Sequence, residues 1–202
     1  MFYATDANDH GLRHDPFKAI VAPRPIGWIG TKGRDGSRNL SPYSFFNIVS
    51  DLPKIVMFSS SGRKDSLRNA EETGVFTASM ASRDLAQKVN ASSVAVPYGI
   101  DEFAVANLSP APGRLVDAPY VAEAYTALEC RVTDIAQPKT LDGQYAESYM
   151  VFGQVVGIHI RDEVIRDGRI DMALMRPIAR MGYRDYCDGG ADIFEMSRPL
   201  TR

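Results

Sequence analysis

Apolar residues in this chain occur in short runs bounded by glycine, proline and polar residues, a pattern that predicts strands rather than long helices. Pro23 and Pro25 interrupt the first run, and prolines inside a strand are typical of a sheet edge or a barrel rim. Residues 32–37 contain an Asp-Gly pair between two runs and predict a hairpin turn. The run at 55–59 is largely apolar, which favours a strand buried on both faces. The expected strands cover residues 19–31, 39–49, 55–59, 75–80, 125–135 and 149–160.

Two short helices are expected between these strands. The first covers residues 62–74, where Asp65 or Ser66 can cap the N-terminus. The second covers residues 82–90, with Ser82 as its N-cap. Because helices and strands do not alternate regularly, a doubly wound parallel sheet is disfavoured. A mainly β fold, an antiparallel β-barrel with α-helical insertions, fits the pattern better.

The remaining segments are expected to be less regular. Residues 92–119 are rich in proline and polar residues and predict an ordered excursion. Residues 137–147 join the last two long strands as a loop, and residues 162–169 contain a turn. The tail from Arg176 has many charges and few periodic apolar residues, so no helix or strand is assigned there.

Composition narrows the class of protein. Hydrophobic residues make up 45% of the 202 residues and charged residues 24%, which is typical of one folded domain covering residues 1–202. A formal net charge of −2 disfavours a general nucleic-acid partner. No run approaches the roughly 20 apolar residues that span a bilayer, and residues 1–14 lack the apolar core of a signal peptide. We therefore expect a cytoplasmic location and no membrane partner.

The isolated titratable residues favour structural roles. Cys130 and Cys187 have no paired spacing, which excludes a disulfide framework and argues against a cysteine metal site. The three histidines suggest no metal site either. His159, at the end of an apolar strand, is better explained as a structural histidine, Glu129 as a surface or paired carboxylate, and Cys130 as a small core residue.

The start of the first helix is a candidate anion site. Ser59 and two more serines precede Gly62, and Arg63 and Lys64 follow it. Backbone N–H groups left unpaired at a helix N-terminus attract anions, and a lysine adds a point charge there. The alternative is a polar loop with a capped helix and solvated cations.

A second candidate is the polar strand at residues 39–44. Pro42 interrupts ordinary pairing and would leave neighbouring hydrogen-bonding groups free for a ligand, although serine and proline also protect plain edge strands from aggregation. Arg24 lies between Pro23 and Pro25, whose rings limit where its guanidinium can go. Such an arginine suits a phosphate or a polar ring edge, and the alternative is a surface arginine.

Five segments then follow one another in a defined order. They are A-P-R-P-I-G-W-I-G-T, N-L-S-P-Y-S-F-F-N-I-V-S, K-D-S-L-R-N-A-E-E-T-G-V-F, F-G-Q-V-V-G-I-H-I and R-P-I-A-R-M-G-Y-R-D-Y. In this order and spacing they resemble the flavin reductase-like proteins of the FMN-binding split-barrel class, in its longer branch. Each segment is weakly specific alone, and the combination is specific.

The resemblance implies a split barrel that forms a homodimer with FMN near the subunit interface. It implies electron transfer from NADH or NADPH through FMN to free flavin, a partner monooxygenase or another acceptor. The residues implied for the flavin ring and ribityl chain are Ser41, Pro42, Tyr43 and Ser44, with Asn47 and Ser59 as additional contacts. Those implied for the phosphate are Lys64, Asp65 and Ser66, and Arg24 would lie near the flavin or the incoming dinucleotide.

One departure from the family pattern supports an alternative function. Shorter flavin reductases often carry a histidine five residues before the glycine of a G-x-V motif, and counting back from Gly153 gives Ser148. His159 lies later on the same strand and does not replace that histidine. The alternative is an FMN-binding electron carrier without its own NAD(P)H activity, and a third hypothesis is a structural split barrel with no cofactor.

Overall fold

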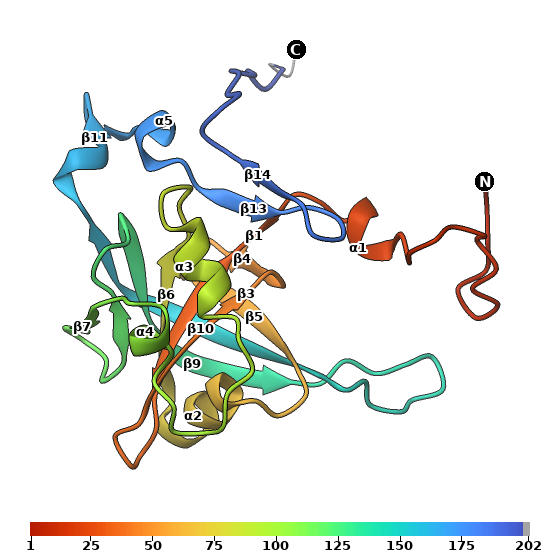
Figure 1. The fold of residues 1–202 in the computed structure, drawn as a ribbon, viewed down its shortest axis with the longest axis horizontal. Helices are drawn as coiled ribbons and strands as arrows, with labels where there is room; N and C mark the ends of the chain where they lie inside the picture. Colours follow the sequence, from red (N-terminus) through yellow and green to blue (C-terminus); the bar gives the residue numbers. More distant parts are fainter. Residues whose placement is uncertain (200–202) are drawn as a thin grey trace.

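A seven-stranded antiparallel sheet forms the centre of the computed structural model, which describes residues 1–199 (Figure 1). The strand order across this sheet is β3-β2-β6-β9-β10-β5-β4. The mainly β prediction is therefore confirmed. The strands are β2 (Gly27–Lys32), β3 (Arg38–Tyr43), β4 (Phe46–Ser50), β5 (Ile55–Ser61), β6 (Val75–Met80), β9 (Thr126–Ala136) and β10 (Ser148–Ile160).

The link between β3 and β4 makes this sheet curl. The two strands lie at opposite edges of the sheet, yet only Ser44 and Phe45 separate them along the chain. Such a link spans at most roughly 11 Å between Tyr43 and Phe46, so the two edges must approach each other. The backbone N–H of Ser59 donates to the Phe45 carbonyl at 2.8 Å and joins the corner to β5. The single strand predicted over residues 39–49 is therefore wrong, because barrel closure divides it in two.

The core lies on both faces of the curled sheet. One cluster gathers around Trp28 and Phe103, and the other around Phe58 and Phe76. Cys130 belongs to the second cluster, which confirms it as a core residue, and burial strongly raises the pKa of its thiol. Strand β5 alternates between buried and half-exposed residues, so the prediction that both its faces are buried is wrong.

Helix α2 (Asp65–Thr73) packs on β2 and β3 through two buried asparagines. Asn69 Nδ2 donates to Thr31 Oγ1 at 3.1 Å, and Asn39 Nδ2 donates to Ser66 Oγ at 2.8 Å. The helix begins later than predicted, and Lys64 occupies its N-cap position with no side-chain capping bond. Capping by Asp65 or Ser66 is thus not observed, because Ser66 Oγ accepts its bond from the barrel.

Helix α3 (Ala86–Ala91) is also shorter than predicted. Its N-cap position is Leu85, so Ser82 is not the cap. The Ser82 hydroxyl instead pairs with the Asp84 carboxylate, and its backbone forms an isolated bridge with Pro177. A contact with the distant C-terminal segment has replaced the local cap.

The C-terminal tail is more regular than its sequence predicts. It supplies β13 (Ile178–Arg180) and β14 (Tyr186–Asp188), which form a three-stranded sheet with β1 (Arg24–Pro25) (Figure 1). No helix within residues 1–199 is long and apolar enough to cross a membrane. The other elements are α1 (Phe17–Ile20), α4 (Glu102–Val105), β7 (Pro110–Pro112), β8 (Pro119–Val121), η1 (Asp162–Val164), β11 (Ile165–Arg166), β12 (Arg169–Ile170) and α5 (Met172–Met175).

Candidate functional site

An open cavity of about 670 Å³ collects most of the residues that the sequence singled out. Seven of the ten predicted site residues line it, namely Arg24, Ser41, Pro42, Tyr43, Ser44, Ser59 and Lys64. Asn47, Asp65 and Ser66 do not line it. Asn47 is exposed on β4, where its Oδ1 accepts the Ile48 N–H at 2.8 Å.

Strand alternation explains why two serines of β5, which form the serine wall of this cavity, line it together. Successive side chains of a strand point to opposite faces, so Ser59 and Ser61 line the cavity. Ser60 lies on the other face, buried, and its hydroxyl donates to the Gly62 carbonyl at 2.9 Å. On β3, Pro42 stays in register opposite Trp28. The strand is therefore not interrupted there, in keeping with the place of proline on edge strands.

Tyr43 carries a buried hydroxyl with no hydrogen-bond partner among residues 1–199. The residue is 8% exposed, and its ring packs against Phe58 with centroids 4.9 Å apart. Burial raises the pKa of Tyr43, and the nearby hydroxyls of Ser66 and Ser60 act in the opposite direction without meeting hydrogen-bond geometry. An unpaired buried hydroxyl costs about 1–3 kcal/mol. This one lies in the interior beside the buried Ser60 and Ser66, so it is not exposed to a ligand in the cavity.

The N-terminus of α2 is the anion-attracting part of the site. Its first backbone bond runs from Arg68 N to the Lys64 carbonyl at 2.9 Å, and no side chain of the N-cap residue satisfies the preceding N–H groups. Lys64 forms no ion pair within the described chain and lines the cavity. Burial raises the pKa of Asp65, and Arg68 partly opposes this shift. The helix end therefore offers donors and a positive charge together.

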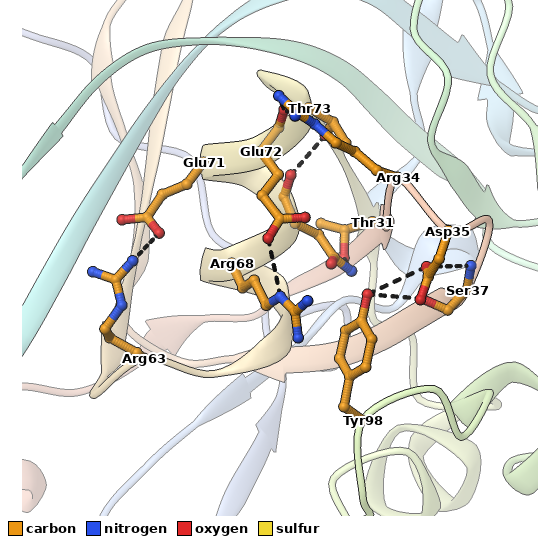
Figure 2. Close-up of polar contacts among 11 residues, drawn as sticks. Thr31, Arg34, Asp35, Ser37, Arg63, Arg68, Glu71, Glu72, Thr73 and Tyr98 are labelled. Atoms are coloured by element: carbon orange, nitrogen blue, oxygen red, sulfur yellow. Dashed lines mark hydrogen bonds and ion pairs between the residues drawn. The ribbon is translucent and has the colours of Figure 1, made fainter.

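Contacts at the other end of α2 fix its position, as Figure 2 shows. Arg34, from the β2–β3 turn, donates to the Glu72 carbonyl through Nε at 3.0 Å and Nη2 at 2.8 Å. Arg68 pairs with Glu72 at 3.0 Å, and its guanidinium lies 4.1 Å from the Tyr98 ring centroid. Tyr98 in turn bonds to Asp35 at 3.3 Å. The turn and a distant loop thus hold the helix, and with it the orientation of its N-terminus.

The Arg24 guanidinium mainly binds backbone carbonyls of neighbouring segments. It is 8% exposed, and its Nη1 donates to the carbonyls of Lys18 and Val21 while Nη2 donates to the Met181 carbonyl at 2.9 Å. These bonds tie the N-terminal segment, β1 and the C-terminal hairpin together. Only Nε remains buried without a partner, so little of the guanidinium is free for a ligand.

The cavity is cationic although the whole chain carries a net charge of −2. Four cations line it, Lys18, Arg24, Lys64 and Arg180, against the single carboxylate of Asp15. Clefts lined by one sign of charge raise the local concentration of the opposite ion. The cavity therefore favours a polyanionic ligand.

Sequence reasoning missed the wall contributed by the C-terminal hairpin. Arg180, Tyr183 and Tyr186 line the cavity, as do Asn90 and Ser93. The spacing of charges and aromatic rings in the tail was visible in the sequence. The pairing of β13 with β1, about 150 residues away, follows from no local pattern.

His159 lies outside this cavity and is a structural histidine, as predicted. Its Nε2 contacts Glu129 Oε1 at 2.6 Å, and its ring stacks on Tyr120 with centroids 4.3 Å apart. Ser148 pairs with the cavity residue Ser61 at the opposite end of β10. At about 3.3 Å per residue, His159 lies on the order of 35 Å from Ser148 along the strand, so it cannot serve that end.

A further cavity, of about 880 Å³, lies beside β7 and β8 and contains none of the ten predicted residues. Two ion pairs neutralise charges in its wall, Lys32 with Asp117 at 2.9 Å and Arg38 with Asp101 at 2.6 Å. Within residues 1–199 no group of three or more His, Cys, Asp or Glu side chains could hold a metal ion. The cavity of about 670 Å³ is therefore the better candidate for a ligand-binding site.

Comparison with known proteins defines the class of protein. The profile of the flavin reductase like domain matches residues 21–177, so the chain belongs to the flavin reductase-like family. An uncharacterized protein of Deinococcus radiodurans is 34% identical over 92% of this chain and 84% of its own length.

Solved structures agree with the split-barrel fold. Nitrilotriacetate monooxygenase component B from Bacillus cereus superposes with a TM-score of 0.86 at 24% identity, covering 97% of this chain and 99% of that one. Flavoredoxin of Desulfovibrio vulgaris (Miyazaki F) superposes with a TM-score of 0.75 at 25% identity, covering 93% and 95%. The curled sheet therefore has the architecture of a flavin reductase-like split barrel.

Proposed function

We propose that this protein is an FMN-binding oxidoreductase that takes electrons from NADH or NADPH. The observation that carries the proposal is the cationic cavity in which serine side chains of β3 and β5 and Lys64, at the uncapped start of α2, occur together. These groups fit a ligand with hydrogen-bonding ring edges and a phosphate. When bound, FMN would accept two electrons as a hydride from the reduced nicotinamide and release them to an acceptor.

The residues of the chain would bind and orient the cofactor. The phosphate would be held by the Lys64 charge and by the backbone N–H groups of Asp65 and Ser66, since the Ser66 hydroxyl is engaged with Asn39. Tyr43 is proposed to contact the ligand through atoms other than its buried hydroxyl. The other ring and ribityl contacts are proposed for Ser41, Pro42, Ser44 and Ser59. Asn47 lies outside the cavity and is the weakest of the proposed contacts.

A homodimer is proposed because β4 exposes apolar residues along a sheet edge. Ile48 is 70% exposed, and Val49, Leu52 and Phe45 are also exposed. An apolar edge strand left uncovered invites pairing with another chain, and a second copy would cover it. Sedimentation equilibrium should give twice the mass of the 22.2 kDa chain, and a stable monomer at micromolar concentration would contradict the proposal.

The electron acceptor is proposed to be free flavin or a partner monooxygenase. Support for a partner comes from the fold match to a protein named as component B of a monooxygenase. A cytoplasmic location and one domain over residues 1–202 stay predictions from the sequence.

Flavin binding is tested on the purified protein by its visible spectrum and by titration with FMN. We expect saturable binding that Lys64→Ala weakens about tenfold, or about 1.4 kcal/mol. Lys54→Ala is the matched control, because Lys54 pairs with Asp51 in a turn outside the cavity. If neither the natural protein nor added FMN gives a flavin complex, the proposal is wrong. Equal affinities for the two variants would remove Lys64 from the site.

A second candidate function is an FMN-binding electron carrier without its own NAD(P)H activity. Ser148 favours it, because this residue pairs with the cavity residue Ser61 and cannot replace an imidazole. Anaerobic addition of NADH or NADPH to the FMN complex separates the two candidates. Rapid stoichiometric bleaching of the flavin would support the reductase, and an unchanged spectrum would support the carrier.

A further inference from the structure

The β13–β14 hairpin contributes to the lining of the same cavity as the serine-bearing strands β3 and β5 and Lys64. Its contributions are Arg180, Tyr183 and Tyr186. Arg24 and Gly182 hold this hairpin in place. Arg24 donates to the Met181 carbonyl, and a Cβ at Gly182 would lie 2.5 Å from the Ala19 Cβ. The hairpin wall is thus fixed against the N-terminal segment.

Arg180 is held in place but carries an uncompensated charge. Its guanidinium donates to the Tyr186 hydroxyl and to the Tyr183 carbonyl, and it lies 4.6 Å from the Tyr186 ring centroid. No carboxylate pairs with it in residues 1–199. Arg176, which comes before β13 in the chain, is neutralised by Asp188, whose Oδ2 lies 2.9 Å from Arg176 Nε. Of these two arginines, only Arg180 keeps donors and an unpaired charge for a ligand.

The tyrosines of the hairpin are unusually available for side chains at a cavity wall. Tyr183 is 50% exposed and Tyr186 is 43% exposed. Tyr183 also has a φ of +54°, a left-handed conformation that bulky residues rarely adopt. Strained backbone of this kind concentrates at ligand-binding positions, and here the Tyr183 carbonyl orients Arg180.

The two walls together offer more anion-binding capacity than one FMN requires. Lys64 and the start of α2 would hold the single phosphate of FMN, while Arg180 lies on the hairpin wall with Lys18 nearby in the same cavity lining. A second anionic group would match the charges of Arg180 and Lys18. Flat rings stack on tyrosine and arginine faces, so the second ligand should combine a planar base with phosphate.

We propose that the β13–β14 hairpin is the subsite for the nicotinamide dinucleotide, with Arg180 binding its phosphate and Tyr186 contacting a planar base. This inference rests on the proposed function, since it assumes that FMN occupies the serine-bearing wall. Arg180 and Tyr186 would then decide the affinity for the electron donor and leave the affinity for FMN unchanged.

The test compares Arg180→Gln with Arg184→Gln, because Arg184 is an exposed arginine of the same hairpin that does not line the cavity. Calorimetric titration of the FMN-loaded protein with NAD⁺ and NADP⁺ measures dinucleotide binding, and fluorescence quenching measures FMN binding. We expect Arg180→Gln to weaken dinucleotide binding about tenfold and FMN binding by less than about twofold. Arg184→Gln should change neither.

Tyr186→Leu gives an independent measurement if Arg180→Gln impairs folding. It should weaken dinucleotide binding at least about fivefold, because a base–aromatic stack is lost. Equal dinucleotide affinity in the Arg180 and Arg184 variants would overturn the subsite, as would a parallel loss of FMN affinity, which would assign the wall to the flavin. Wild-type protein that binds FMN but neither dinucleotide at about millimolar concentration also overturns the subsite. Wild-type protein that binds no FMN overturns the proposed function itself.

Discussion

Replacing Glu129 with glutamine should destabilise the fold strongly, although the substitution changes only one atom of the carboxylate. Glu129 is 1% exposed. Its Oε1 accepts the Arg114 N–H at 2.8 Å and contacts His159 Nε2 at 2.6 Å. Its Oε2 accepts the N–H groups of Leu115 and Val116 at 2.6 and 3.0 Å. This carboxylate therefore holds three successive backbone donors of the segment between β7 and β8.

The magnitude follows from the number of acceptors that glutamine retains. The amide oxygen can serve the Leu115 and Val116 donors, and its NH₂ group then faces Arg114 and His159. His159 can accept from that NH₂ in one tautomer, but the Arg114 N–H loses its acceptor at a cost of about 1–3 kcal/mol. Loss of charge weakens the remaining bonds by about 1 kcal/mol more. We expect a total loss of about 3 kcal/mol, or roughly 6–12 °C in Tm.

The pH dependence of this loss has a defined sign. Burial raises the pKa of Glu129, but the N–H groups of Arg114 and Leu115, the His159 ring and the Val116 N–H outweigh it, so the pKa lies below its ordinary value. Between the folded and unfolded pKa values the unfolded state binds more protons, so this contribution to stability increases with pH. It is complete above the unfolded value of about 4.3 and is lost as the pH falls through the folded value. The difference in free energy of unfolding between the wild type and Glu129→Gln should therefore become smaller at acid pH.

Urea unfolding monitored by Trp28 measures this effect, since Trp28 is fully buried and is the only tryptophan of the sequence. Glu123→Gln is the matched control, because Glu123 also accepts a backbone N–H, from Ser109 at 3.0 Å, but in an exposed position. We expect the control to lose less than about 1 kcal/mol. Equal losses for the two variants, or a gap that stays constant from about pH 7 to pH 3, would refute the reasoning.

Two further substitutions give equally specific expectations. Tyr43→Phe should leave the free energy of unfolding of the cofactor-free protein within about 0.5 kcal/mol, because the hydroxyl has no partner in the described chain. It should leave FMN affinity within about twofold, because that hydroxyl lies in the interior beside Ser60 and Ser66. Urea unfolding and FMN titration check both halves, and a loss of more than 1 kcal/mol without cofactor, on the order of one hydrogen bond, would reveal a protein partner for the hydroxyl. Gly153→Ala should cost about 1–3 kcal/mol in the same unfolding assay, because the new Cβ would lie 2.4 Å from the buried Phe76 ring. Gly157→Ala on the same strand is its control, since there the nearest atom is the end of the Leu115 side chain at 3.3 Å, and equal costs at the two positions would contradict the packing argument.

Much of the barrel could be predicted from local pattern alone. Strand β6 has the predicted bounds, and β9 and β10 differ from prediction by one residue at their ends. The predictions of these strands are accurate because alternation and β-branched content are properties of neighbouring residues. The errors at Ser44 and at Ser82 have a different origin. In both places a contact with a distant segment, with β5 or with Pro177, decides the local structure.

The candidate site divides in the same way. The serines of β3 and β5 and Lys64 lie within one short stretch of chain, so their chemistry could be recognised in the sequence and they do line one cavity. Arg24 also lines that cavity, but the backbone carbonyls that occupy its guanidinium belong to segments whose approach no local pattern predicts. Arg180 was missed because the tail shows its strand only once it pairs with β1.

The separation of the two walls along the chain has a functional consequence. Ser59, Ser61 and the start of α2 belong to the seven-stranded sheet and its helix, whereas Arg180, Tyr183 and Tyr186 belong to the β13–β14 hairpin. The hairpin is attached to the cavity by the pairing of β13 with β1 and by the hydrogen bond from Arg24 to the Met181 carbonyl. It contributes no strand to the seven-stranded sheet. Substitutions in the hairpin can therefore alter one wall without disturbing the barrel that would hold the flavin. With the proposed subsite on the hairpin, a substitution there would change the affinity for the electron donor and leave the affinity for FMN unchanged.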